Sequence, residues 1–153
     1  MLKIGDKAPN FKLKDQSGLE YTLKEYTEQK KKVLIYFYPK DDTPGCTTEA
    51  CSFRDGIKDL AKLGLAVLGI SKDSVKSHKK FSDKYKLNFP ILSDESLETI
   101  KAYEAYGLKK FMGREYDGVF RKSFLIDEKG KIEKIYEDVK PDTHVSEVKG
   151  DVK

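Results

Sequence analysis

The chain has 153 residues, of which 38% are hydrophobic and 37% are charged, and its formal net charge is +4. This length and composition fit one domain with a substantial core, spanning residues 1–153. No apolar stretch approaches the roughly 18–20 residues that cross a bilayer. The lysines alternate with acidic residues, so we expect neither a membrane protein nor a nucleic-acid-binding one. The first residues lack the apolar segment of a signal peptide, and we therefore expect a cytoplasmic protein.

In chain order, the sequence predicts strands and helices that alternate along most of its length. Apolar residues fill both faces of the run Val33–Tyr38, which indicates a strand in the middle of a sheet that is covered on both sides. From Thr47 to Leu63 the apolar positions recur at helical spacing, and Gly64 follows as a C-terminal cap. Before these two elements we expect a hairpin of strands at 11–14 and 20–23. After them we expect a strand at 65–71, a helix at 74–85, a short strand at 89–94, a helix at 96–106, an aperiodic surface segment at 109–118, a hairpin at 121–127 and 131–136, and a weakly helical tail at 142–153.

This order of elements predicts an α/β fold. Strands that alternate with helices pair in parallel, and a terminal hairpin adds antiparallel strands. The expected result is a central mixed β-sheet flanked by helices on both faces, which resembles the thioredoxin-like layout. Because no linker, repeat or low-complexity segment divides the chain, we predict one domain.

The two cysteines, Cys46 and Cys51, lie where the buried strand gives way to the following helix. Unpaired backbone N–H groups and the positive end of the helix dipole meet at such a junction. This environment favours the thiolate over the thiol. In the cytoplasm a cysteine pair is more often catalytic or metal-binding than a structural cross-link, so the pair predicts redox chemistry.

The residues around Cys46 resemble the active-site signature of the peroxiredoxins. Pro39, Thr43 and Cys46 follow the strand in the pattern Pro-x-x-x-Thr-x-x-Cys. A second cysteine at the position of Cys51 resembles the bacterioferritin-comigratory-protein, or peroxiredoxin Q, branch of that family. The resemblance continues through residues 5–11, 109–113 and 121–127, so it covers nearly the whole chain in order.

The resemblance implies a thiol-dependent peroxidase that reduces hydrogen peroxide and organic hydroperoxides without metal, haem or flavin. By position, Cys46 would be the peroxidatic cysteine, which becomes a sulfenic acid. Cys51 would be the resolving cysteine, which converts that acid into an intramolecular disulfide. A thioredoxin-like dithiol protein would then reduce the disulfide. The branch is often monomeric, and we expect a monomer with no cofactor.

Four further residues receive roles from the same resemblance. Thr43 and Arg121 would be polar partners of the peroxide, Pro39 would shape the pocket, and Glu49 would orient the arginine. These roles suit the chemistry. A free cysteine with a pKa of about 8.5 is mostly protonated at neutral pH. The attack also spreads negative charge over both peroxide oxygens, which fixed hydrogen-bond donors stabilise.

Helix geometry imposes a condition on the disulfide. Two Cα atoms five residues apart on an ideal helix are separated by roughly 8.6 Å, whereas a disulfide needs roughly 4.4–6.8 Å. We therefore predict that the first turns of the helix unwind when Cys46 bonds to Cys51.

Other interpretations of the same residues stay open at this point. The cysteines could form a structural disulfide or be inert core thiols, and a zinc site lacks nearby ligands. Thr43 could be only a helix cap, Glu49 only a partner of the helix dipole and Arg121 only a surface ion-pair residue. The sequence places His78 on a solvated helix face and His144 on the surface of the tail.

Two other functions compete with the peroxidase. A thioredoxin-like protein thiol-disulfide oxidoreductase usually has two residues between its cysteines, but four separate Cys46 from Cys51. A redox-sensing or chaperone-like binding module on the same fold would need no turnover. Consumption of peroxide that depends on Cys46 separates the first function from the other two.

Overall fold

The computed structural model describes residues 1–152. The last residue of the predicted tail, Lys153, lies outside the described residues. The strands are β1 (Lys12–Lys14), β2 (Glu20–Thr22), β3 (Lys32–Phe37), β4 (Leu65–Ser71), β5 (Ile91–Ser93), β6 (Tyr106–Phe111), β7 (Arg114–Val119), β8 (Lys122–Ile126) and β9 (Ile132–Tyr136). The helices are α1 (Leu23–Glu28), α2 (Pro44–Lys62), α3 (Val75–Tyr85), α4 (Glu98–Ala102) and α5 (His144–Val152).

Seven strands form one mixed sheet in the order β2-β1-β5-β4-β3-β8-β9. Strands β3, β4 and β5 pair in parallel, as expected for strands joined through helices. Strand β8 pairs antiparallel to β3, and β9 pairs antiparallel to β8. The predicted α/β fold with a central mixed sheet is confirmed.

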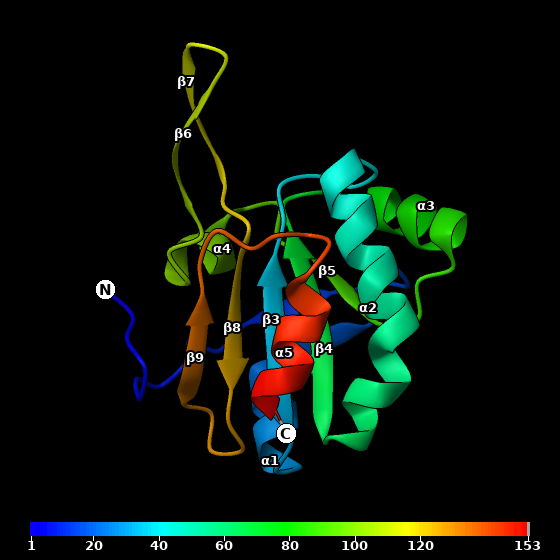
Figure 1. Cartoon of the computed structure of the whole chain (residues 1–153), viewed down its shortest axis with the longest axis vertical. Coiled ribbons are helices and arrows are strands. Elements are labelled where there is room, and N and C mark those ends of the chain that lie inside the picture. Colours follow the sequence, from blue (N-terminus) through cyan, green and yellow to red (C-terminus); the bar gives the residue numbers. More distant parts are fainter. Residues whose placement is uncertain (153) are drawn as a thin grey trace.

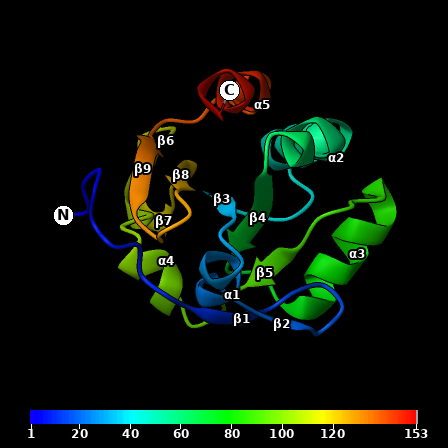
Figure 2. The same cartoon turned by 90° about the horizontal axis from the view of Figure 1, so that it is seen from below.

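Helices cover both faces of the sheet, as Figure 2 shows from below. Strand β3 alternates its side chains between the two cores because successive residues of a strand point to opposite faces. Leu34, Tyr36 and Tyr38 enter the core beneath α2 and α5. Ile35 and Phe37 enter the core on the opposite face, together with residues of α1 and α4. The strand is therefore buried on both sides, which explains its continuous apolar sequence.

Strand pairing brings distant parts of the chain together at the end of β3. Phe37, the last residue of β3, pairs with Lys122, the first residue of β8. Arg121 directly precedes β8, so it lies beside the loop that leaves β3 and leads to α2. In Figure 1 this loop lies at the upper end of the sheet, at the start of α2.

Helix α2 begins at Pro44, three residues before the predicted Thr47, and ends at Lys62, next to the predicted end at Leu63. Pro44 occupies the first turn, where its missing N–H costs nothing. At the other end, the N–H of Gly64 donates to the carbonyl of Ala61, and Gly64 has φ +78°. Glycine adopts this left-handed conformation without steric cost, so the predicted C-terminal cap is confirmed.

Three segments differ from the sequence prediction. Residues 109–118 are not an aperiodic excursion, because β6 and β7 form an antiparallel hairpin that projects from the body of the molecule (Figure 1). Leu23 does not continue a strand but begins α1, where the hydroxyl of Thr22 accepts a hydrogen bond from the Glu25 N–H. Helix α4 is shorter than predicted and ends before β6.

Within residues 1–152, no helix combines the length and the apolar character needed to cross a bilayer.

Candidate active site

Cys46 lies in the first turn of α2, with its side chain in the core beneath that helix. Only 1% of its surface is exposed. Cys51 lies further along the same helix and is half-buried. Both thiols are free. They therefore stand apart on one continuous helix, the arrangement from which the predicted unwinding would start.

Arg121 joins the helix to the sheet at Cys46. Its Nη2 donates a hydrogen bond to Cys46 Sγ at 3.3 Å, and its Nη1 donates to Glu49 Oε1 at 3.0 Å. Burial opposes the charge of Arg121, but Cys46 and Glu49 more than offset this and hold the pKa of the guanidinium above its usual value. The arginine therefore remains a cation beside the sulfur, where it favours negative charge.

Glu49 is fully buried on the inner face of α2. Burial raises its pKa from 4.5 to about 7, although the nearby Arg121 acts in the opposite direction. One carboxyl oxygen, Oε1, pairs with Arg121, while Oε2 has no hydrogen-bond partner among residues 1–152. Near neutral pH this carboxyl therefore changes between its protonated and ionised forms. Arg121 contacts both this carboxyl and the Cys46 sulfur, and no other residue is needed to link them.

The backbone before Cys46 lets the arginine approach closely. A Cβ at Gly45 would lie 3.0 Å from Arg121 Nη2, so a side chain there would push the guanidinium away. Thr43 is half-buried at the N-cap position of α2, but its side chain makes no cap hydrogen bond. Its hydroxyl donates instead to the carbonyl of Lys40 at 2.9 Å. Pro39 is half-buried in the same loop, directly after Tyr38.

The six predicted site residues are thus distributed in two groups. Contacts join Cys46, Arg121 and Glu49 directly. Thr43 and Pro39 lie in the loop that leads into α2, and Cys51 lies one turn and a half beyond Cys46 on the helix. Within the described residues, no hydrogen bond joins the Thr43 hydroxyl to the Cys46 sulfur and no disulfide joins Cys51 to it.

The prediction that His78 lies on a solvated helix face is wrong. His78 is 0% exposed and bridges Asp41, at 2.7 Å from its Nδ1, to the Leu92 carbonyl, at 3.0 Å from its Nε2. Neighbouring lysines suggested a polar face, but His78 shares a helical stripe with Phe81 and Ser82, which are also buried. The spacing of three and four residues from His78 to Phe81 and Ser82 is the sequence signal that marks the buried face of α3.

The surface placement of His144 is also wrong. His144 is 1% exposed, and its Nε2 lies 2.8 Å from Ser123 Oγ. Its ring packs edge-on against Phe53 and Tyr136. Burial lowers the pKa of this imidazole, although Glu147 acts in the opposite direction. His144 therefore anchors the start of α5 to β8 and is not a surface residue.

One group of side chains has the arrangement of a cation site. Asp41, Asp73 and His78 each offer a ligand atom, and these atoms lie within 4.8 Å of one another. However, both nitrogens of His78 and both oxygens of Asp41 already take part in hydrogen bonds within the protein. Neither cysteine belongs to this group, so it does not support the zinc interpretation of the cysteine pair.

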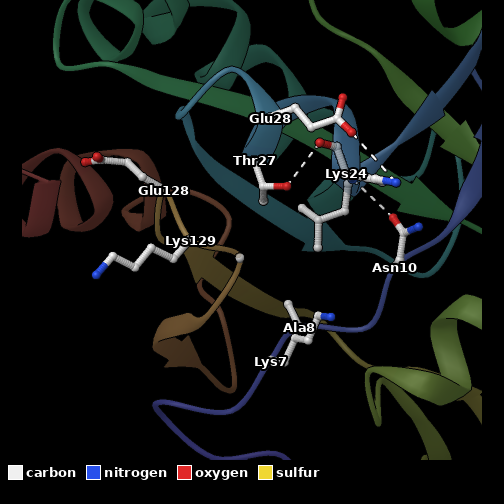
Figure 3. Close-up of a pocket in the computed structure, with 10 residues that line it drawn as sticks. Lys7, Ala8, Asn10, Lys24, Thr27, Glu28, Glu128 and Lys129 are labelled. Carbon is white, nitrogen blue, oxygen red and sulfur yellow. Dashed lines mark hydrogen bonds and ion pairs between the residues drawn. The ribbon is translucent and has the colours of Figure 1, made fainter.

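A pocket of about 410 Å³ lies away from the cysteines. Figure 3 shows its lining, with Lys24, Thr27 and Glu28 of α1 facing Lys129 of the turn between β8 and β9. Helix α1 precedes β3, so this pocket lies at the sheet end opposite to Cys46. Its nearby charges pair locally, as in the Lys24–Glu28 ion pair, and no thiol lines it.

Comparison with known proteins gives consistent relatives. Residues 4–135 match the model of the AhpC/TSA family. The chain is 48% identical to the peroxiredoxin Bcp of Escherichia coli over 143 residues, which cover 94% of this chain and 90% of that one. It is also 48% identical to a putative peroxiredoxin bcp of Coxiella burnetii over 149 residues, 97% of each chain.

Solved structures agree with this relationship. A mutant of Xylella fastidiosa PrxQ superimposes with a TM-score of 0.92 at 33% identity, covering 99% of this chain and 96% of that one. The bacterioferritin comigratory protein of Xanthomonas campestris superimposes with a TM-score of 0.89 at 32% identity over the same shares. From its sequence and its fold, the chain belongs to the AhpC/TSA family, in the Bcp or peroxiredoxin Q branch.

Proposed function

We propose that this protein is a thiol-dependent peroxidase that reduces hydrogen peroxide and organic hydroperoxides, with Cys46 as the peroxidatic cysteine. The contact between Arg121 Nη2 and Cys46 Sγ at 3.3 Å carries this proposal. It sets a permanent cation beside a buried sulfur at a helix start, where a thiolate is favoured. The relatives support it, since they are named peroxiredoxins and the Xanthomonas protein is described by its alkyl peroxide reduction activity.

In the first step the Cys46 thiolate attacks one peroxide oxygen and the O–O bond breaks. Cys46 becomes a sulfenic acid, and the other oxygen leaves as alkoxide or hydroxide and takes up a proton. Arg121 stabilises the negative charge that spreads over the two oxygens. The Thr43 hydroxyl donates to Lys40, so its oxygen is free to accept a hydrogen bond from the peroxide O–H. Pro39 limits the pocket without offering a competing N–H.

In the second step Cys51 is the resolving cysteine. Its sulfur attacks the sulfenic sulfur of Cys46, a disulfide forms and water leaves. A thioredoxin-like dithiol protein then reduces the disulfide by thiol exchange and is itself oxidised. We further propose that the protein works in the cytoplasm as a monomer, that Glu49 orients Arg121, and that the reaction needs no cofactor, nucleic acid or membrane.

Peroxide consumption with a dithiol reductant tests the function. We expect Cys46→Ser to abolish it and Cys51→Ser to weaken it, while Ser52→Ala, a matched change beside Cys51, leaves it intact. Mass spectrometry after one equivalent of peroxide should find the Cys46–Cys51 bond. Reduction of protein disulfides without any consumption of peroxide would instead identify a disulfide oxidoreductase.

A further inference from the structure

The loop between β3 and α2 is fastened to α3 by two consecutive aspartates. Asp41 is buried and accepts a hydrogen bond from Ser77 Oγ at 2.8 Å. Asp42 is exposed and accepts from Lys84 Nζ at 2.9 Å and Tyr85 Oη at 2.7 Å. All three partners are side chains of α3, with Ser77 in its first turn and Lys84 and Tyr85 in its last. The loop therefore takes its shape from α3.

Asp41 receives a dense set of hydrogen bonds. Tyr38 Oη donates to its Oδ1 at 2.6 Å, and Ser77 Oγ donates to its Oδ2 at 2.8 Å. His78 Nδ1 lies 2.7 Å from the same Oδ2. Hydrogen bonds directed at both oxygens favour the ionised carboxylate.

The partners of His78 determine its charge. Its Nε2 lies 3.0 Å from the Leu92 carbonyl, which can only accept, so this nitrogen carries a proton. Its Nδ1 faces the Asp41 carboxylate, which also only accepts. Acceptors therefore face both ring nitrogens, which is the arrangement that suits an imidazolium.

A second carboxylate lies near this pair. Asp73 Oδ2 accepts hydrogen bonds from the Asp41 backbone N–H at 2.9 Å and from Ser71 Oγ at 2.7 Å. Ligand atoms of Asp41, Asp73 and His78 lie within 4.8 Å of one another. Two carboxylates this close repel each other in a partly buried site, and a positive charge on His78 offsets that repulsion.

We propose that the buried His78–Asp41 ion pair positions Cys46 for its reaction with peroxide, by holding the loop from Tyr38 to Thr43 against α3. The inference rests on the proposed peroxidase function and names a positioning residue for it. His78 touches neither the sulfur nor the substrate. It acts through Asp41, five residues before Cys46, and so sets where α2 begins.

The start of α2 depends on this outside support. Thr43 occupies the N-cap position without a cap hydrogen bond, so no side-chain cap helps to fix the first turn of the helix. When α2 unwinds for the disulfide, Asp41 and Asp42 keep the loop on α3. The unwinding then starts after Asp42 and does not reach β3.

Two reactions of the Cys46 sulfur test the positioning role in a Cys51→Ser background. Oxidation by hydrogen peroxide needs access to the thiolate and the aligned donors, whereas alkylation by iodoacetamide needs access to the thiolate but not the donors. In His78→Gln, which keeps a hydrogen-bonding side chain without the charge, we expect the ratio of the peroxide rate to the alkylation rate to fall about 10-fold or more. In Ser77→Ala the ratio should fall in the same direction by about twofold or more. Lys79→Ala, on the exposed face of α3, should leave it unchanged.

The outcomes distinguish this inference from the proposed function. If Cys46 of the otherwise unchanged protein does not react with peroxide, the peroxidase proposal fails. If it reacts and His78→Gln keeps the same ratio, the positioning role is overturned. Should His78→Gln not fold, an unchanged ratio in Ser77→Ala overturns it instead. Nitrogen NMR of the intact protein must also show both His78 nitrogens protonated at neutral pH, and a single protonated nitrogen contradicts the ion pair.

Discussion

The protonation state of Glu49 determines the charge beside Arg121. Glu49 is fully buried, and its pKa of about 7 reflects burial opposed by Arg121. Below that pH the carboxyl is neutral and Arg121 directs its charge chiefly to Cys46. Above it, the guanidinium is shared between a carboxylate and the sulfur. We therefore expect a change at Glu49 to alter the pH dependence of stability, and a change at Arg121 to alter the rate at which Cys46 reacts.

Glu49→Gln should remove a pH dependence of stability. The folded protein keeps a proton on Glu49 between pH 4.5 and about 7, whereas the unfolded chain releases it near 4.5. The contribution of Glu49 to the free energy of unfolding therefore declines as the pH rises through this window, by roughly 3 kcal/mol at most. Urea unfolding of both proteins at several pH values measures it. Because other titrating groups are common to both, identical pH profiles would contradict the expectation.

Arg121→Lys should slow the oxidation of Cys46 by peroxide about 100-fold. A lysine keeps the charge but offers a single ammonium, which cannot donate to Cys46 and Glu49 in the fixed fork that the guanidinium provides. Stopped-flow measurement of the peroxide reaction checks this, with the exposed Arg114→Lys on the hairpin as the control. Equal rates for Arg121→Lys and the unchanged protein would mean that charge alone suffices.

Single residues show how far the sequence could predict the site. The position of Cys46 at a strand-to-helix junction follows from local patterns. Its meeting with Arg121, 75 residues away, does not follow from spacing. It depends on the pairing of β3 with β8, which local sequence patterns do not specify. His78 was misplaced because its lysine neighbours outweighed the spacing that links it to Phe81.

At the scale of elements, α2 carries both cysteines, and we predict that it changes shape when they form a disulfide. Addition of one equivalent of peroxide should speed amide hydrogen exchange in residues 44–52, because an intact helix keeps the two Cα atoms too far apart for a disulfide. Exchange in β3 and β4 should stay slow. Exchange measured by mass spectrometry on the reduced and oxidised proteins decides this. Equal protection of α2 in both states would show that the bond forms without unwinding.

Helix α5 packs beside α2 on the same face of the sheet (Figure 2) and depends on a buried histidine. His144→Ala loses the contact with Ser123 and the packing against Phe53 and Tyr136, and leaves a cavity. We expect a loss of about 2–4 kcal/mol in the free energy of unfolding. Ser146→Ala, an exposed change on α5, should cost less than about 0.5 kcal/mol. Urea unfolding of the two variants makes the comparison, and equal stabilities would contradict an anchoring role.

The elements that the sequence missed share a physical property. Strands β6 and β7 are mostly exposed and pair chiefly with each other, so no alternation of buried and exposed residues marks them. Helix α1 has six residues, too few to show helical periodicity, and a local cap at Thr22 begins it. Long elements that bury one or both faces were predicted well because burial dictates their residues.

At the scale of the whole molecule, the ends of the sheet bear on its assembly. The edge strand β2 has three residues, and the other edge, β9, carries Glu133 and Lys134. Short and charged edges discourage pairing with a second copy. We therefore expect a monomer in sedimentation velocity. A dimer would contradict this, and its loss in Phe111→Ser would assign it to the hairpin, where Leu108, Phe111, Met112 and Tyr116 are exposed.

Cys46 is 1% exposed while Cys51 is half-buried, so the sulfur that we propose to react with peroxide is the less accessible of the two. A bulky maleimide should consequently label Cys51 first in the resting protein, whereas labelling of Cys46 must wait for a transient opening of α2. The ratio of Cys46 labelling to Cys51 labelling then reports how often α2 opens. The two native cysteines are thus sufficient to measure this motion, and no further labelling site has to be introduced.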